Sequence, residues 1–334
     1  MTSIPAHQNP VTSIEGLRPV NLGTDLAPLA DLMELVFANS MDQGGRAAVR
    51  EMRTLGQLGA SFLAGVNELT LGINMGYVWI ADGRLVGNVS IYPARGFQRK
   101  TWIIANVGVH PDFRRQGIAH SLMEASMELI RQRGGEQAIL QVDVDNAAAQ
   151  ALYTGLGFVS ERSWILWRRS TSLRPPLPSE TSLHITHRRA GDWQAEYTLA
   201  QRLRPQSKGG LGWQRPLDTR QFRKPILEQM TDWLNMRSVE RLVIRSEDET
   251  QLLAAMWIER GFLGSNTHLT LLVEPEYQGD YDEVLINTAA RRFSGRSQAL
   301  MIEHPADETR TSEVLRDYAF RPQREVTHMR WDIR

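Results

Sequence analysis

An internal repeat is the feature that most constrains how this chain of 334 residues can fold. Pro111 and Pro275 each follow an apolar segment, and 164 positions separate them. The tripeptide Arg95-Gly96-Phe97 is repeated as Arg260-Gly261-Phe262 after 165 positions, and a third pair of similar segments lies near the ends of the two halves. Similar segments that keep their order at a nearly constant separation indicate that one fold occurs twice.

The length supports the same conclusion, because domains commonly have roughly 100–200 residues. The segment Arg174-Pro175-Pro176-Leu177-Pro178-Ser179 has no hydrophobic period, and its prolines hold the backbone extended, as in a linker. We therefore predict a first domain over residues 14–169, a linker over residues 170–181 and a second domain over residues 182–334.

Hydrophobic periodicity predicts the elements of the first domain. Apolar residues recur at helical spacing over residues 26–37, with Asp25 as the expected cap. Further helices are expected at 46–58, 117–133 and 146–156, and strands at 17–20, 76–81, 85–92, 102–109, 138–144 and 158–167. This order predicts an α/β fold with two similar domains, each with a mixed central sheet and helices on both faces.

Composition excludes several classes of protein. The chain has no cysteine, which excludes disulfides, thiolate zinc sites and a cysteine nucleophile, and fits a cytoplasmic location. Its 38 basic and 38 acidic residues balance, so no overall charge attracts it to nucleic acid or to an anionic membrane. No segment approaches the roughly 18 apolar residues of a membrane span, and the start lacks a signal-peptide pattern. We predict a monomer or homodimer without nucleic-acid or membrane partners.

The segment from Val107 to Ala119 combines a strand end, a turn and the first turn of a helix. The first amides of a helix have no partners within the helix and carry the positive end of its dipole, which suits a phosphate group. Gly117 and Ala119 leave room for phosphate oxygens beside the backbone, and Arg114 and Arg115 add positive charge. The alternative is an ordinary helix start with two solvated arginines.

A second motif follows over residues 146–158. These residues match the pattern N-x-x-A-x-x-L-Y-x-x-L-G-F without a gap. Together with Arg114-x-x-Gly117-x-Ala119, this motif resembles the GCN5-related N-acetyltransferase (GNAT) superfamily, and the repeat indicates its tandem-domain type. The resemblance is closest over residues 76–167, whereas residues 17–58 fit the more variable start of that family.

The resemblance implies a GNAT-like fold in both domains and acetyl-CoA, or another acyl-CoA, as cosubstrate. It places the pyrophosphate on the amides of residues 114–119 and the pantetheine arm between the strands at 102–109 and 138–144. The residues implied to bind the cofactor are Val107, Gly108, Val109, Arg114, Arg115, Gln116, Gly117, Ile118, Ala119 and Asn146. Gly108 also fits a bulge or a close backbone approach, which a glycine near a strand end often marks. Asn146 is equally suited to capping its own helix.

Tyr153 is the implied catalytic residue. In that family the tyrosine hydroxyl lies near the thioester sulfur, where it can protonate the leaving thiolate. The alternative role is packing of an aromatic ring on an amphipathic helix. The base that takes the proton of the amine stays open, with His110, Asp143 and Asp145 near the expected strand ends as candidates.

The second half lacks the cofactor signature. Its equivalent turn, residues 275–283, has no arginine and carries four carboxylates, which would repel pyrophosphate. The third pair of similar segments aligns residues 315–320 with residues 152–158, and the segment of the second half is one residue shorter. This alignment makes Tyr318 the nearest counterpart of Tyr153. We predict that the second domain is a degenerate GNAT-like copy that covers the first domain or shapes its acceptor pocket.

These features predict an N-acetyltransferase that moves an acetyl group directly from acetyl-CoA to a primary amine of a small molecule or peptide. The alternative is a non-catalytic acyl-CoA sensor or scaffold, against which Tyr153 and Asn146 argue. No motif identifies the acceptor, because acceptor recognition depends on the leading helices, the loop near Met41 and the second domain.

Overall fold

The computed structural model describes residues 15–38, 41, 43–58, 75–170, 172–181, 183–223, 238–261, 266–296 and 298–333. The predicted start of the first domain, residue 14, lies outside these residues. The chain divides into two compact units. One comprises the residues up to Ala94, Lys100–Leu140 and the residues from Asp332, and the other comprises Arg95–Arg99 and Gln141–Trp331.

The first unit contains a mixed sheet close to the one predicted. Its elements are β1 (Gly16–Pro19), α1 (Leu22–Phe37), α2 (Gln43–Leu58), β2 (Met75–Ala81), β3 (Arg84–Pro93), β4 (Thr101–Val109), η2 (Pro111–Phe113), α4 (Ile118–Gln132) and the first part of β5 (Gln137–Asp143). The strand order is β1-β2-β3-β4-β5, antiparallel up to β4 and parallel between β4 and β5. The helix α1 is capped by Asn21, whereas the expected cap Asp25 lies inside the helix and pairs with Arg18.

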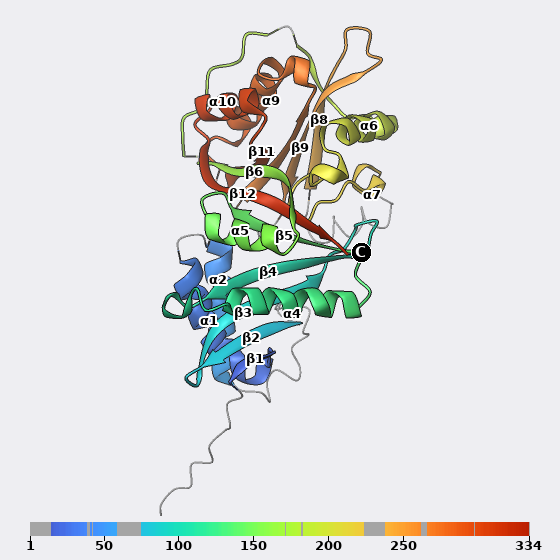
Figure 1. Ribbon diagram of the computed structural model, residues 1–334. Coiled ribbons are helices and arrows are strands. Elements are labelled where there is room, and N and C mark those ends of the chain that lie inside the picture. The colour runs from blue at the N-terminus through green and yellow to red at the C-terminus, as the bar shows by residue number, and fades with distance from the viewer. Residues whose placement is uncertain are drawn as a thin grey trace, which may run out of the picture. The chain divides into compact units, whose positions relative to one another are not determined.

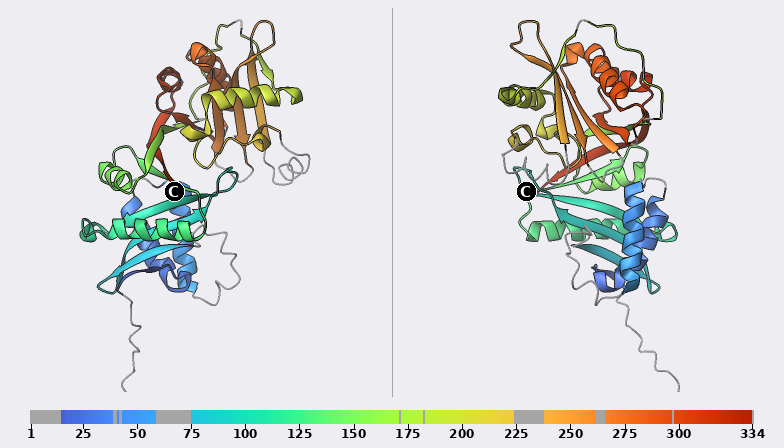
Figure 2. Two further views of the ribbon diagram at one scale, coloured as in Figure 1. Left: turned by 45° about the vertical axis from the view of Figure 1, so that its right-hand side comes forward. Right: turned by 180° about the vertical axis from the view of Figure 1, so that it is seen from behind.

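Helices cover both faces of this sheet. A Cβ atom on Gly87 would lie 2.9 Å from the side chain of Ile118 on α4, and one on Gly108 would lie 3.2 Å from Val36 on α1. Gly108 pairs with Asn88, the residue next to Gly87, and adjacent strand residues face opposite ways. Figure 1 shows α4 in front of the strands, and the view from behind in Figure 2 shows the blue helices α1 and α2 on the other side. The predicted arrangement is confirmed.

The second unit contains the remaining elements. They are α5 (Ala147–Gly155), β6 (Val159–Arg169), β7 (Ile185–His187), η3 (Ala190–Asp192), α6 (Trp193–Leu203), η4 (Gln206–Lys208), α7 (Thr219–Phe222), β8 (Ser238–Arg245), β9 (Leu252–Arg260), β10 (Asn266–Val273), η5 (Pro275–Tyr277), α9 (Asp280–Phe293), β11 (Ala299–Pro305), α10 (Thr309–Asp317) and β12 (Arg321–Asp332). The strand order is β12-β6-β11-β10-β9-β8-β7, and β10 and β11 are parallel.

β6 belongs to the first half of the sequence but pairs within the second unit. It lies between β11 and β12 and runs antiparallel to both. The end of β5 also meets β12, since Val144 donates its amide to the Glu325 carbonyl at 3.2 Å and Asp143 pairs with Arg324. Along the chain, the passage from the first unit to the long segment of the second therefore falls after Leu140 and not at the proline-rich segment, because the last strands of the two halves pair with each other. The domain limits at residues 169 and 182 remain a prediction about the repeat in the sequence.

The proline-rich segment is irregular, as expected for a linker, but it is held in place. Residues 172–181 form no helix or strand. Asn287 on α9 donates from its side chain to the Leu177 carbonyl at 2.7 Å, and Arg291 donates to the Pro176 carbonyl at 3.0 Å. The segment is therefore anchored along α9.

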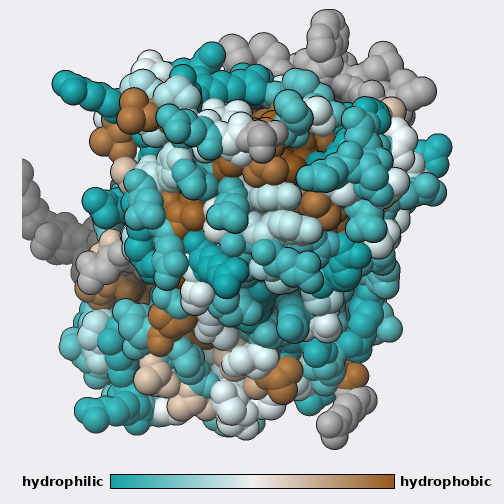
Figure 3. Space-filling view, turned by 90° about the horizontal axis from the view of Figure 1, so that it is seen from above, coloured by the Kyte–Doolittle hydropathy of each residue, from teal (hydrophilic) through white to brown (hydrophobic). Residues whose placement is uncertain are grey.

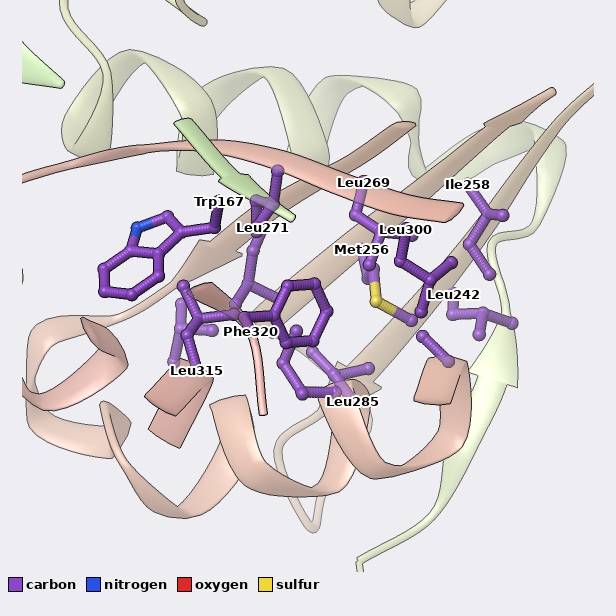
Figure 4. Packing of buried hydrophobic residues seen from close by; sticks show 14 of the residues in the cluster. Trp167, Leu242, Met256, Ile258, Leu269, Leu271, Leu285, Leu300, Leu315 and Phe320 are labelled. Carbon is purple, nitrogen blue, oxygen red and sulfur yellow. The ribbon is translucent and has the colours of Figure 1, made fainter. Parts of the chain in front are cut away.

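The sheet of the second unit also packs helices against both faces. Met256 and Ile258 on β9 belong to the buried cluster that includes Leu285 on α9 (Figure 4). The alternate residues Ala255 and Trp257 lie in a second cluster with helix α6. Because successive strand side chains point to opposite faces, α9 and α6 lie on opposite sides of this sheet.

A buried ion pair links the end of α6 to the start of α10. Arg204 is 3% exposed, and its Nη2 atom lies 2.8 Å from Oε2 of Glu308, the N-cap residue of α10. Arg162 on β6 donates to the other carboxylate oxygen of Glu308 at 2.8 Å. Burial alone would raise the pKa of Glu308, but the charges and hydrogen bonds of Arg204 and His304 together outweigh burial and hold that pKa well below its usual range. Glu308 is therefore charged at neutral pH.

We expect Glu308→Gln to lower the free energy of unfolding by about 3 kcal/mol, because the buried charge of Arg204 loses its partner. The pKa of Glu308 is lower in the folded chain than the ordinary value of about 4.3, so its contribution is present at pH 7 and lost as the pH falls below that value. Denaturant unfolding at neutral and acidic pH measures both effects. The exposed Glu313→Gln on α10 is the control, and equal small changes in both variants would contradict the expectation.

The visible surface is mostly hydrophilic (Figure 3), as expected when the apolar residues are buried in these clusters. Among the described residues, no helix is long and apolar enough to cross a membrane. Seen from above, hydrophilic side chains dominate the visible face and hydrophobic ones form small separate patches (Figure 3). Scattered apolar residues of this kind are normal on a water-exposed surface.

Candidate active site

The helix start selected from the sequence forms an uncapped turn in the first unit. β4 leads through η2 into α4, and Arg115 and Gly117 in the connection have left-handed backbone angles, with φ of 62° and 79°. No side chain caps Gly117, and the Ser121 amide bonds the Gly117 carbonyl at 3.0 Å as the first bond of the helix. Within the described part of the chain, the amides of residues 115–120 have no hydrogen-bond partner. These six donors are available to an anion.

The same turn offers space and positive charge. It brings together the predicted phosphate contacts Arg114, Arg115, Gln116, Gly117, Ile118 and Ala119. A Cβ atom on Gly117 would meet no atom within 4 Å, so the space beside it is open. Arg115 is exposed and has no acidic partner among the described residues, whereas Arg114 donates from Nε to the Val109 carbonyl at 3.2 Å. Ile118 packs its side chain on β3 and is 3% exposed, so only its amide is suited to a ligand.

β4 carries a bulge directly before the predicted acyl contacts. Asn88 of β3 pairs with Gly108, but Ser90 pairs with Ala105, so β4 has one extra residue between these two pairs. The bulge contains Asn106, whose φ of 53° is left-handed. A bulge of this kind bends the strand and leaves backbone groups unpaired.

The bulge follows the point where β4 leaves β5. Parallel pairing of the two strands covers Thr101–Ile103 and ends before the bulge. Val107, Gly108 and Val109 therefore have an edge that is not paired with β5. Gly108 makes the expected close approach, because it lies against α1, while the bulge itself lies at Asn106.

Tyr153 and Asn146 lie in the second unit, on and directly before α5. Tyr153 is 6% exposed, its ring centre lies 6.1 Å from that of Phe158, and its hydroxyl has no hydrogen-bond partner among the described residues. Burial raises the pKa of this hydroxyl to about 12. It is therefore protonated at neutral pH and suited to donate a proton.

Asn146 has the capping role that was the alternative to cofactor binding. Its side-chain oxygen accepts the amide of Ala149 at 3.1 Å, which leaves the NH₂ group of Asn146 available as a donor. The turn at Gly117 and the residues of α5 belong to different compact units. Joint action of the turn and Tyr153 therefore rests on the family pattern.

The three candidate bases lie in different surroundings. His110 accepts the Asp112 amide on Nδ1 at 3.3 Å, and Asp143 is paired with Arg324. Asp145 is exposed in the turn before α5. Among the described residues, no group of acidic and histidine side chains could hold a metal ion.

The corresponding turn of the second half is shorter and is capped. Pro111 and Pro275 are 164 positions apart, but the first residues of α4 and α9 are only 162 apart, so two residues are missing there. The Gly279 amide donates to Oδ2 of Asp282 at 2.7 Å, and Asp282 is completely buried. The helix start that is open in the first half is thus closed by a carboxylate of its own helix in the second.

β10 also differs from β4. Its pairing with β9 runs from Thr267 to Val273 without a shift in register. Its parallel pairing with β11 extends over four residues, Asn266–Leu269, compared with three between β4 and β5. The second half therefore lacks the bulge as well as the open turn.

The counterpart of Tyr153 in the second half is Leu315. The N-cap residues Asn146 and Glu308 are 162 positions apart, and the helices α5 and α10 that follow have equal lengths of 9 residues. Tyr318 is the C-cap residue of α10, as Leu156 is of α5. The prediction that Tyr318 matches Tyr153 is wrong. It assumed that the second half is one residue shorter here, whereas α5 and α10 have the same length.

Asn88 and Asn106 were not selected from the sequence. Both stand within apolar strand segments, where asparagine is uncommon because it fits a pleated, half-buried surface poorly. This mismatch with the strand pattern is the signal that could have identified the bulge.

Comparison with known proteins agrees with this geometry. Residues 64–158 match the model of the acetyltransferase (GNAT) family. A mycothiol acetyltransferase from Saccharomonospora viridis is 42% identical over 83 residues, which are 23% of this chain and 27% of that protein. The aligned segments cover less than half the length of the curated relatives that head the matches.

Two solved structures share the fold along nearly the whole chain. A GCN5-related N-acetyltransferase from Sphaerobacter thermophilus has a TM-score of 0.60 and 16% identity, with 95% of each chain covered. A tandem GNAT protein from the clavulanic acid biosynthesis pathway has a TM-score of 0.50 and 15% identity, with 95% of this chain and 98% of that chain covered. The fold is therefore the GNAT fold, present twice. The chain therefore has a tandem GNAT fold, and its residues 64–158 match the acetyltransferase (GNAT) family.

Proposed function

We propose that this chain is an acetyltransferase that uses acetyl-CoA and a primary amine, with its active site in the first repeat. The observation that carries the proposal is the turn at Gly117, where six amides without partners, an open space and an exposed arginine meet at a helix start. The family match over residues 64–158 supports the same reaction. The acceptor is an amine of a small molecule or peptide, and the cytoplasm is the proposed location.

In this proposal the cofactor lies along the elements of the first repeat. The free amides of residues 115–119 bind the pyrophosphate, with the charge of Arg115 beside them. The Arg114 amide, which was also expected there, bonds the Pro111 carbonyl at 3.3 Å instead. The pantetheine arm bonds to Val107–Val109 like an added strand, because β4 has left β5 there. The free NH₂ group of Asn146 donates to a carbonyl of the same arm.

The chemistry needs two protons removed from the nitrogen, one before attack and one from the tetrahedral adduct, and one proton supplied to the leaving sulfur. An alkyl amine has a pKa of about 10.4, so the acceptor must lose a proton before it attacks at neutral pH. Its nitrogen then bonds to the thioester carbonyl carbon, and the C–S bond breaks with its electron pair on sulfur. Tyr153 donates its hydroxyl proton to that thiolate and is reprotonated from solvent. Both protons lost by the nitrogen leave through water, since no described side chain is assigned as the base.

The second repeat is proposed to be inactive. Its turn is two residues shorter and closed by Asp282, β10 has no bulge, and Leu315 stands where Tyr153 is in the first repeat. Each of these changes removes a different part of the site. Its proposed roles are to cover the first repeat or to shape the acceptor pocket.

A direct test mixes the full-length protein with acetyl-CoA and a panel of small amines, peptides and aminated antibiotics. Release of free CoA that depends on the amine, together with an acetylated product in mass spectrometry, is the expected result. Binding of acetyl-CoA without transfer to any amine would favour the sensor alternative. No binding of acetyl-CoA would contradict both functions.

A further inference from the structure

Three side chains tie β3 to the bulge of β4, and we name Asn88, Ser90 and Asn106 the asparagine clasp. Nδ2 of Asn88 donates to the backbone carbonyl of Asn106 at 3.0 Å. Nδ2 of Asn106 donates to Oγ of Ser90 at 3.2 Å. The bulge is therefore held by side chains at the place where the strand ladder is interrupted.

The clasp is built at a local cost. Asn88 is 2% exposed, and its Oδ1 atom is buried without a hydrogen-bond partner among the described residues. Asn106 has left-handed backbone angles, which are unfavourable for residues other than glycine, although asparagine tolerates them better than most. A buried unpartnered acceptor and an unfavourable backbone in adjacent strands are features that proteins retain where geometry serves function.

The second repeat forms the same kind of sheet without the proposed cofactor site, so its residues at the equivalent strand positions serve as a comparison. The pair Asn88 and Gly108 corresponds to the pair Ala255 and Leu272 on β9 and β10, at separations of 167 and 164 positions. Both replacements are apolar and buried, and the pairing there is continuous. The clasp and the open turn thus occur together in one repeat and are both missing from the other, although the sheet forms in each.

We propose that the asparagine clasp positions the acyl arm of the cofactor. It fixes the bulge so that the backbone of Val107–Val109 stays free of β5 and open to the pantetheine chain. Asn88 and Asn106 are positioning residues in this scheme, because they act through the β4 backbone. The inference rests on the proposed function, since it assumes that acetyl-CoA binds at the first repeat.

The test compares two ligands on full-length variants by calorimetry. The ligands are acetyl-CoA and 3′-phospho-ADP, the nucleotide half of the cofactor without the arm. In Asn106→Val the β-branched side chain disfavours the left-handed backbone, so we expect acetyl-CoA to bind at least about tenfold more weakly and 3′-phospho-ADP to change less than about twofold. Asn88→Ala removes one bond of the clasp and is expected to shift the same ratio by a smaller factor.

Asn106→Gly is the matched control, because glycine accepts the left-handed backbone and keeps the carbonyl that Asn88 bonds. It is expected to retain the ratio of the two affinities within about threefold. A purely structural clasp would lower Tm in all three variants and leave this ratio unchanged, and that result would overturn the inference. A wild-type protein that binds 3′-phospho-ADP but shows no gain from the acyl arm would also overturn it. A wild-type protein that binds neither ligand would overturn the proposed function itself.

Discussion

Tyr153→Phe is expected to lower acetyl transfer by about 10²–10⁴-fold while the affinity for acetyl-CoA hardly changes. Phenylalanine keeps the packing of the ring beside Phe158 and removes only the hydroxyl, whose pKa burial raises to about 12. The leaving thiolate then has no proton donor at that position. The measurement is turnover at saturating acetyl-CoA and amine, with a binding isotherm for each variant.

Tyr318→Phe is the control for this variant. The Tyr318 hydroxyl donates to Oε1 of Glu283 at 3.1 Å in the second half, so its loss should leave turnover unchanged. Because the pKa of Tyr153 is raised, activity should not fall from titration of this group between neutral pH and about pH 10. If turnover of Tyr153→Phe stays within a few-fold of the wild type, Tyr153 only packs, and water or another group supplies the proton.

Gly117→Glu is expected to weaken acetyl-CoA binding by about 10³-fold or more, because it puts a carboxylate where the pyrophosphate would bind. The space beside Gly117 is open, so the new side chain fits without a clash. Its φ of 79° makes any side chain there somewhat strained, at a cost of roughly 1–2 kcal/mol in stability. The increase of Tm that acetyl-CoA gives the wild type should disappear in this variant.

Gly279→Glu provides a matched control in the same chain. Gly279 occupies the equivalent position before α9, has a φ of 99°, and also has open space beside it. Its ψ of −69° lies outside the left-handed region, so the variant carries at least as much backbone strain as Gly117→Glu, yet acetyl-CoA should still raise its Tm as in the wild type. Full-length variants are needed, because a fragment of the second half would lack β6, which lies between β11 and β12.

The local elements of the first repeat followed from the sequence. The limits of β2, β3 and α4 differ from the expected ones by at most one residue. Apolar periodicity and the glycines at the turns are local signals, and these elements depend mainly on them. The turn at Gly117 could be selected for the same reason, because a helix start with small residues is visible in a few consecutive positions.

The features that the sequence did not reveal depend on distant residues. Nothing in the pattern of β6 shows that it pairs with β11 and β12, because a strand's periodicity does not name its partners. The bulge at Asn106 depends on Asn88 and Ser90 in the neighbouring strand. The cap by Asp282 depends on a buried place for its carboxylate, where the sequence alone suggested a repelling surface charge.

Counting acetyl-CoA sites per chain tests most directly the claim that a single site lies in the first repeat. Calorimetric titration of the wild type, Gly117→Glu and Gly279→Glu gives the number of sites and the affinity for each protein. We expect one site per chain in the wild type, none in Gly117→Glu, and one of unchanged affinity in Gly279→Glu. Two sites in the wild type, or a site lost in Gly279→Glu and kept in Gly117→Glu, would contradict the assignment of the cofactor to the turn at Gly117.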